Sequence, residues 1–355
     1  MTQIRVLVVE DSATVRDKLC SVLATDPGIE LVGSAGNGRE AIDLCQAKRP
    51  DVVTMDMMLP VMSGLAATEY IMAHCPTPIL VVSSSFNRGE LFKMYDALAA
   101  GAVDVLEKPS GMEPEGVWES RFLTTLKIVS RIRVITHPRA RLRTHDPYAP
   151  PLVHEATAMS RPLQVAAIGA STGGPSAIVD LLRSLSADFT TPILLVLHIN
   201  ALFGTAFADW LDAQTPRRAA FAHDGEPVSG AAGRVVMAPP DRHMIVKGGR
   251  IYLNDGPERF SCRPSVDVLF DSVAAEYGPT AAACLLTGMG RDGASGLLAI
   301  RNAGGMTFAQ DEATSVVYGM PREAAQIGAP RRILPLGEIG PALSALSRER
   351  SVAVR

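Results

Sequence analysis

The chain has 355 residues, which is longer than one ordinary compact domain and predicts two. Its net charge of −3 favours neither nucleic acid nor an anionic membrane surface as a partner. No apolar run reaches the ~18 residues that cross a bilayer, so we expect no direct membrane insertion. The five cysteines are scattered without a Cys-x-x-Cys pair, which favours reduced core thiols in a cytoplasmic protein.

From residue 4 to about residue 124, short apolar runs alternate with helix-length amphipathic stretches. The first run ends at Glu10 and Asp11, which favours a buried strand over a signal peptide. The alternation predicts a parallel sheet with helices on both faces. The expected strands are Arg5–Val9, Leu31–Ser34, Val52–Met55, Ile79–Ser83 and Val103–Leu106.

Polar side chains follow several of these strands at the edge where a doubly wound sheet binds its ligands. They are Glu10, Asp11, Asp56, Ser83 and Lys108. One acidic pair alone would be explained as a surface loop, but several converging strand ends favour a ligand site. Clustered carboxylates suit a hard divalent cation such as Mg²⁺. An aspartate beside that cation can attack a phosphoryl donor, and a lysine and a hydroxyl can then bind the phosphoryl oxygens.

Four segments of this half resemble two-component receiver domains: Val8–Ser12, Thr54–Gly64, Ser83–Ser84 and Glu107–Pro109. The resemblance implies a flavodoxin-like (βα)5 receiver over residues 1–124, with Asp56 as the phosphoacceptor. It also implies that Ser83 and Lys108 contact the phosphoryl group. The Mg²⁺ ligands that it implies are Glu10, Asp11, Asp56 and the backbone carbonyl of Met58.

The chain departs from the receiver pattern at two positions. Ser63 stands where an aspartate is usual, and Val105 stands where an aromatic switch residue is common before the lysine. The departure at Val105 concerns how the phosphorylation signal is passed on from the domain. It does not alter the phosphorylation site itself.

Residues 125–160 have a different composition and are expected to form a basic, Pro-rich linker. The stretch from about Trp118 to Ile135, which runs into this linker, is expected to continue as an amphipathic helix. We interpret the arginines of this stretch as part of a solvated tether. A docking surface for an acidic partner is the alternative. A second α/β domain is expected over residues 161–350. Its expected strands are Gln164–Ile168, Ile193–Leu197, Arg234–Ala238, Ala282–Leu286 and Met306–Ala309.

The turn Gly169-Ala170-Ser171-Thr172-Gly173 has the Gly-x-Ser-x-Gly pattern directly after an expected strand. The glycines permit a tight turn that presents the serine hydroxyl, and Pro175 suits the first turn of the next helix. Glycine-rich turns of this kind also bind pyrophosphate, which is the competing interpretation. The middle glycine of a dinucleotide motif is absent here, so the hydrolase interpretation is favoured.

A serine nucleophile needs a base and a group that orients the base. His198 ends the next expected strand, and Asp292 lies in a glycine-rich loop after a later one. A lone histidine behind an apolar run is often only a core residue, so the argument depends on all three strand ends meeting. The order Ser171, His198, Asp292 differs from that of the α/β-hydrolases, chymotrypsin and subtilisin.

The second half resembles CheB-type methylesterases, the protein-glutamate methylesterases of chemotaxis that act as response regulators. The matching segments are Gly169–Pro175, Ala238–His243, Arg263–Phe270, Thr287–Gly293, Gln310–Asp311 and Gly319–Pro321. The resemblance implies a doubly wound, mostly parallel α/β esterase. In it, Ser171 is the nucleophile, His198 the general base and acid, and Asp292 the orienting carboxylate. The backbone N–H groups of Thr172 and Met289 are candidates for the oxyanion hole.

The activity implied is hydrolysis of glutamate γ-methyl esters on the cytoplasmic helices of chemoreceptors, with release of methanol, together with glutamine deamidation. A histidine kinase would phosphorylate Asp56 and relieve a block of the esterase cleft by the receiver. Mg²⁺ is expected at the receiver alone, with no cofactor for the esterase, and we expect a monomer. The chain departs from the family at Ile199-Asn200, where Met-Pro is common. His243 is expected to have a loop role, although it could also line the substrate cleft, and Asp267 is expected on a solvated helix face.

Two other functions remain open on the sequence. The first is a receiver-controlled serine esterase or amidase that acts on a different substrate. The second is a non-catalytic signalling adaptor, which the complete Ser, His and Asp set disfavours.

Overall fold

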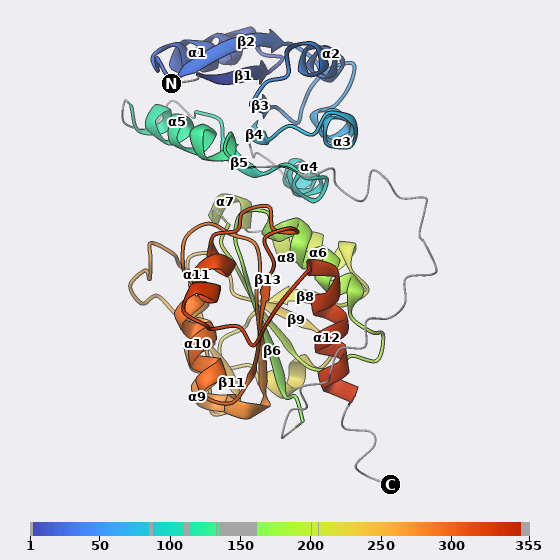
Figure 1. Cartoon of the computed structure of the whole chain (residues 1–355), viewed down its shortest axis with the longest axis vertical. Coiled ribbons are helices and arrows are strands. Elements are labelled where there is room, and N and C mark those ends of the chain that lie inside the picture. The colour runs from blue at the N-terminus through green and yellow to red at the C-terminus, as the bar shows by residue number, and fades with distance from the viewer. Residues whose placement is uncertain are drawn as a thin grey trace. The chain divides into compact units, whose positions relative to one another are not determined.

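The computed structural model describes residues 3–84, 88–109, 114, 116–132, 134, 162–199, 201–204 and 206–348 (Figure 1). The chain divides into two compact units, Met1–Ala149 and Pro150–Arg355, and each has its own parallel sheet. Most of the expected linker, residues 125–160, lies outside the described residues. In the described part of the chain, no helix is both long and apolar enough to cross a membrane.

The first unit is a five-stranded sheet in the order β2-β1-β3-β4-β5, and every neighbouring pair is parallel. The strands are β1 (Ile4–Val9), β2 (Ile29–Ala35), β3 (Val52–Met55), β4 (Ile79–Ser83) and β5 (Asp104–Glu107). All five expected strands are confirmed, with β2 longer than expected and β5 displaced by one residue. Strands β3 and β4 are buried at every residue and β1 is buried from Val6 to Val9, which is typical of the centre of a parallel sheet covered on both faces, whereas the edge strands β2 and β5 are partly exposed.

The helices of the first unit are α1 (Ala13–Ala24), α2 (Gly38–Lys48), α3 (Gly64–His74), α4 (Arg88–Ala99) and α5 (Val117–Val129). Helices α1 and α5 pack together, as do α2 with α3 and α3 with α4 (Figure 1). The hydroxyl of Ser63 accepts a hydrogen bond from the backbone N–H of Ala66 at 3.3 Å and so caps α3. Helix α5 ends at Val129, earlier than the expected Ile135, which itself lies outside the described residues; the expected boundary at residue 124 falls inside this helix.

The second unit has a seven-stranded sheet in the order β14-β13-β12-β6-β7-β9-β8, again with parallel neighbours. The strands are β6 (Val165–Ala170), β7 (Ile193–Leu197), β8 (Ala219–Phe221), β9 (Val235–Met237), β12 (Ala281–Leu285), β13 (Met306–Gln310) and β14 (Arg332–Leu334). A separate antiparallel hairpin consists of β10 (His243–Lys247) and β11 (Arg250–Asn254). The expected doubly wound, mostly parallel α/β fold is confirmed.

Helices cover both faces of this sheet. On one side α6 (Gly174–Ser184) packs against α12 (Leu336–Arg348), and on the other α10 (Ala294–Asn302) packs against α9 (Val266–Tyr277) and α11 (Met320–Gln326) (Figure 1). The remaining helices are α7 (Ala201–Gly204), α8 (Phe207–Gln214) and the short 3₁₀ turns Val228–Ala231 and Gly278–Thr280. A Cβ at Gly169 would collide with Val266, so this glycine lets α9 lie close to β6.

Four strands were not expected from the sequence. Strands β8 and β14 have three residues each, too few to show a pattern. The hairpin of β10 and β11 did carry a signal, because Gly248 and Gly249 separate two apolar runs. Both glycines adopt positive φ angles, 58° and 71°, which a tight hairpin turn requires.

Candidate active site and candidate phosphoacceptor pocket

The predicted nucleophile, base and carboxylate of the second unit follow three strands that are neighbours in the sheet, β12, β6 and β7. Ser171 comes directly after β6, His198 after β7, and Asp292 in the loop after β12. Because these strands are parallel, their carboxyl ends meet at one edge. This edge lies where the strand order changes direction, the place where open α/β sheets bind ligands.

The turn that carries Ser171 is packed closely against the loop after β12. The backbone N–H of Ser171 donates to the carbonyl of Thr287 at 3.0 Å. A Cβ at Gly288 would lie 2.7 Å from the Cβ of Ser171, so only glycine fits beside the serine. Gly173 has a φ of 77°, and helix α6 begins at the next residue with a proline in its first turn, as the sequence predicted.

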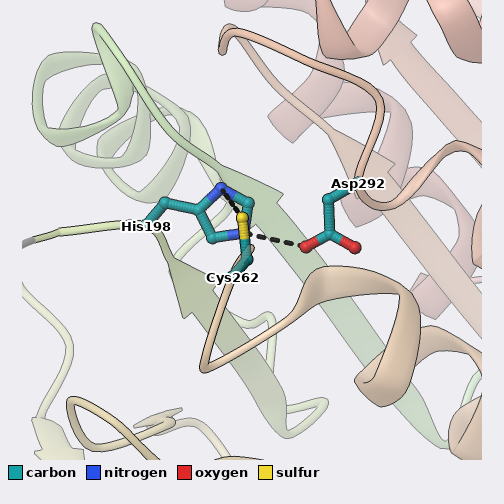
Figure 2. A group of neighbouring side chains, drawn as sticks. All are labelled: His198, Cys262 and Asp292. Carbon is teal, nitrogen blue, oxygen red and sulfur yellow. Dashed lines mark hydrogen bonds and ion pairs between the residues drawn. The ribbon is translucent and has the colours of Figure 1, made fainter. Parts of the chain in front are cut away.

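His198 is held between two partners, which Figure 2 shows together with it. Its Nε2 lies 2.8 Å from Oδ2 of Asp292, and its Nδ1 lies 3.7 Å from Sγ of Cys262. Burial lowers the pKa of His198, but the contacts with Asp292 and Cys262 outweigh burial and raise it to about 9. The carboxylate therefore stabilises the imidazolium form of His198.

Asp292 is only 2% exposed, yet it keeps a lowered pKa. Burial raises that pKa, but His198 and several other donors outweigh it. Its Oδ1 accepts from the hydroxyl of Ser265 at 2.8 Å and from the N–H of Asp267 at 3.1 Å, and its Oδ2 accepts from the N–H of Val266 at 2.7 Å. These donors belong to the N-terminus of α9, whose positive dipole end favours an anion.

Ser265 is a site residue that sequence reasoning missed. Its backbone N–H donates to Nδ1 of His243 at 3.1 Å, and the other ring nitrogen of His243 lies 3.0 Å from the carbonyl of Pro257. His243 is therefore a buried support for the α9 cap, where the sequence favoured a loop role. A serine directly before an apolar helical run is a capping signal that could have found Ser265. Asp267, expected on a solvated face, is fully buried and accepts from the N–H of Gly296 at 2.6 Å.

Cys262 is the second residue that sequence reasoning missed, because its spacing to other cysteines carries no signal. It is half-buried beside His198, so the expectation of a core thiol is wrong for this position. Cys45 and Cys284 are the fully buried cysteines.

The structure brings His198 and Asp292 into contact and places Ser171 at the same sheet edge. Among the described residues, however, no hydrogen bond joins the hydroxyl of Ser171 to His198. Since Nε2 is bonded to Asp292, Nδ1 is the ring atom left to receive the serine proton. Hydrogen bonds of this kind are often long in the free enzyme and tighten when substrate binds.

The two oxyanion-hole candidates lie on the loops around Ser171. The carbonyl of Thr172 accepts from the hydroxyl of Thr287 at 3.0 Å, which ties the loops together. The side chain of Met289 is 41% exposed. No described residue accepts a hydrogen bond from the backbone N–H of Thr172 or Met289, so both donors are available to a ligand.

In the first unit, the three predicted metal-binding carboxylates lie together. Glu10, Asp11 and Asp56 each offer an oxygen within 4.8 Å of the others, and Asp11 is exposed while the other two are buried. Nζ of Lys108 lies 2.8 Å from Glu10 and 3.0 Å from Asp56. Burial raises the pKa of Glu10. Burial opposes the charge on Lys108, but its two carboxylate partners outweigh burial and raise the pKa of Lys108.

The pocket is held by backbone contacts at the strand ends. The N–H of Asp56 donates to the carbonyl of Val9 at 3.0 Å, and a Cβ at Gly64 would collide with the carbonyl of Asp56. The hydroxyl of Ser83 is buried and has no hydrogen-bond partner among the described residues, as expected of a group that receives a ligand oxygen. Met58 lies two residues after Asp56, in the loop after β3, and its side chain is exposed.

The donor set of this pocket fits Mg²⁺. Every potential ligand is an oxygen, the carboxylates are close enough to share one ion, and the exposed Asp11 leaves room for retained water molecules. The loop that carries Met58 begins directly after Asp56. A position of the Met58 carbonyl near the same carboxylates remains a prediction.

Two family models match the chain. Residues 166–343 match the CheB methylesterase, and residues 6–114 match the response regulator receiver domain. A protein-glutamate methylesterase/protein-glutamine glutaminase of Anaeromyxobacter dehalogenans is 43% identical over 97% of this chain and 97% of that one. The chain belongs to the CheB methylesterase family.

A second CheB-family relative, from Nitrosospira multiformis, carries the same activity in its name and is 41% identical over 98% of each chain. Among solved structures, the Thermotoga maritima CheB methylesterase catalytic domain is 33% identical, with a TM-score of 0.49, and covers 52% of this chain and 100% of that one. The response regulator domain of Thermotoga maritima CheB is 34% identical, with a TM-score of 0.33, over 37% of this chain and 98% of that one.

Proposed function

We propose that this chain is a phosphorylation-controlled protein-glutamate methylesterase that also deamidates glutamine side chains, the activities named for its relatives. The substrates would be glutamate γ-methyl esters on the cytoplasmic helices of chemoreceptors. The observation that carries the proposal is the pair of His198 and Asp292, held by the N-terminus of α9 beside the turn of Ser171. An adaptor without catalytic activity would not need this arrangement.

The chemistry would proceed through an acyl-enzyme. Nδ1 of His198 takes the proton of the Ser171 hydroxyl as the oxygen attacks the ester carbonyl, and Asp292 stabilises the imidazolium. The backbone N–H groups of Thr172 and Met289 would hold the negative charge that develops on the carbonyl oxygen. His198 then returns the proton to the departing methoxide, which leaves as methanol. Water, activated by the same histidine, would cleave the acyl-enzyme.

Deamidation would use the same groups. Attack of Ser171 on a glutamine amide gives the same acyl-enzyme, with ammonia as the leaving group after His198 donates a proton. Both reactions therefore end at a glutamate side chain, and no metal ion is needed in the second unit.

Control would come from the first unit. The carboxylate of Asp56 would attack a phosphoryl donor, with a histidine kinase as the physiological source. The ion that Glu10, Asp11, Asp56 and the Met58 carbonyl would hold is Mg²⁺, which supplies charge neutralisation at the phosphoryl group. Lys108 and the Ser83 hydroxyl, which has no hydrogen-bond partner in the described part of the chain, would contact the new phosphoryl oxygens.

Phosphorylation would act on an equilibrium between a blocked and an open esterase. A bias of a few kcal/mol is enough to change the open population many-fold. Activity by this route requires only one chain, so we propose a monomer that works in the cytoplasm with receptors and kinase.

The test is methanol release from methylated receptor membranes, with and without Mg²⁺ and a small phosphodonor. Ser171→Ala should abolish release, whereas Ser21→Ala, an exposed serine on α1, should leave it unchanged. Asp56→Ala should remove only the response to phosphodonor, and the exposed Asp43→Ala on α2 should retain that response. No release by the folded protein from several receptor types would overturn the methylesterase assignment.

A further inference from the structure

The thiol of Cys262 lies beside the imidazole of the proposed esterase triad. Its Sγ lies 3.7 Å from Nδ1 of His198, while Nε2 of the same ring lies 2.8 Å from Asp292 (Figure 2). A thiol next to an imidazole that a side chain orients from its far nitrogen is the arrangement by which cysteine hydrolases activate their nucleophile. The contact therefore has the geometry that activation of a thiol by an imidazole requires.

A pocket opens at this contact. Its volume is about 270 Å³, and it is lined by His198, Ile199, Ser261, Cys262, Arg263 and Pro264. Cys262 is half-buried and faces this space, so a small molecule can reach the sulfur. Buried thiols in apolar surroundings are inert, but a partly exposed thiol beside a basic group reacts.

We propose that Cys262 is a modification site that forms a mixed disulfide with small organic disulfides, and that this adduct blocks the esterase. Nδ1 of His198 takes the proton of the thiol, and the thiolate attacks one sulfur of the small disulfide. The original sulfur–sulfur bond breaks as the new one to Cys262 forms, and the leaving thiolate takes up the proton from His198. The small disulfide is the sole oxidant.

The adduct would block the esterase because Ser171 and Cys262 share one base. Asp292 occupies Nε2, so Nδ1 is the ring atom that must take the proton of Ser171. A group attached to Sγ occupies the space next to that nitrogen, since the sulfur is already 3.7 Å away. Loss of activity is then expected in proportion to the fraction of chains modified.

A metal ion between the same three side chains is the alternative, and the hydrogen bonds of Asp292 disfavour it. Both of its carboxylate oxygens already accept hydrogen bonds from Ser265, Val266 and Asp267 as well as from His198. An ion would have to replace some of these bonds, whereas a covalent adduct on Cys262 leaves them in place.

The test treats the full chain with oxidised glutathione and locates adducts by peptide mass spectrometry, with methanol release measured in parallel. We expect an adduct on Cys262, a fall in rate that follows its occupancy, and recovery with a reducing agent. The Sγ atoms of Cys45 and Cys75 lie 4.0 Å apart in the first unit and could respond separately. The variant Cys75→Ala lacks that pair and should still lose activity when it is treated with oxidised glutathione. Cys262→Ala should keep its own untreated rate during treatment.

Adduct formation has a readout that does not depend on the esterase. In Ser171→Ala, Cys262 should still be modified. Modification of Cys262 therefore does not depend on the proposed function, and only the inhibitory step rests on it. His198→Gln should slow modification of Cys262 by about tenfold or more, while the half-buried Cys20 serves as the internal reference. An unmodified Cys262, or a fully modified Cys262 with undiminished methanol release, would overturn the inference.

Discussion

The hydroxyl of Ser265 lies 2.8 Å from Oδ1 of Asp292 and also accepts from the N–H of Val268 at 3.3 Å, so one side chain caps α9 and holds the carboxylate. His198 is the largest influence that lowers the pKa of this carboxyl, and the Ser265 hydroxyl adds to it, so an acid that is 2% exposed remains ionised. The helix N-terminus supplies the remaining donors, and the carboxylate in turn orients His198.

Ser265→Ala is expected to weaken both roles. Loss of the cap and of one hydrogen bond to a buried carboxylate should lower stability by about 1–2 kcal/mol. The kcat should fall while KM changes little, because the defect lies in the orientation of His198 rather than in substrate contact. Ser63→Ala is the matched control, since it removes a cap from α3 in the first unit. Steady-state kinetics and denaturant unfolding would check this; equal effects of the two variants on kcat would contradict it.

The pH dependence of the esterase should report the pKa of His198, which is raised to about 9. A protonated imidazole cannot act as the base, so kcat/KM should rise with pH towards that value. Asp292→Asn should move this rise to lower pH and reduce kcat by about 10³–10⁴-fold. A pH profile measured at constant ionic strength for both proteins decides the point, and an unshifted rise in the variant would show that another group is being titrated.

The same pKa has a consequence for stability. Because the pKa of His198 is raised from 6.5 to about 9, its pair with Asp292 stabilises the folded state fully below pH 6.5. That contribution should be lost as pH rises through about 9. Thermal unfolding at several pH values should show the loss in the parent chain and a smaller one in His198→Gln. A loss of equal size in that variant would argue against this pair as the cause.

Gly288→Ala should damage catalysis without removing any proposed catalytic group. The new Cβ would lie 2.7 Å from the Cβ of Ser171 and would also collide with Met320, so the serine must move. A displacement of this kind can cost about 10²-fold in kcat. Gly337→Ala, which places a Cβ in open space, is the control. Kinetics of both variants would test the prediction, and wild-type kcat in Gly288→Ala would refute it.

Binding of Mg²⁺ should stabilise the first unit against thermal unfolding, because an ion that binds only the folded state shifts the equilibrium by mass action. Asp11→Asn removes one of the clustered carboxylates and should reduce this stabilisation. Asp43→Asn, which alters an exposed acid on α2, should leave the response unchanged. Differential scanning calorimetry with and without EDTA measures the stabilisation by Mg²⁺. Equal responses in both variants would place the ion elsewhere.

Much of the fold could be predicted because each short apolar run forms a strand of a parallel sheet, and most of these strands are buried. Positions at the carboxyl ends of the strands also indicated Glu10, Asp56, Ser171 and His198 as candidates, since open α/β sheets bind their ligands at that edge. Three-residue edge strands such as β8 carried too little pattern to be found. The error at Asp267 arose because an acid at helical spacing resembles a solvated face, whereas here the carboxylate accepts from the N-terminal residues of α10.

By itself, the sequence determined the two α/β folds, the family, and the residues that the proposed chemistry requires. These features depend on local patterns, which are written in consecutive residues. Only the tertiary structure decided that Asp292 is held by Ser265 and that Cys262 lies beside His198. These contacts join segments that are 27 and 64 residues apart, and side-chain packing between distant loops determines which atoms meet.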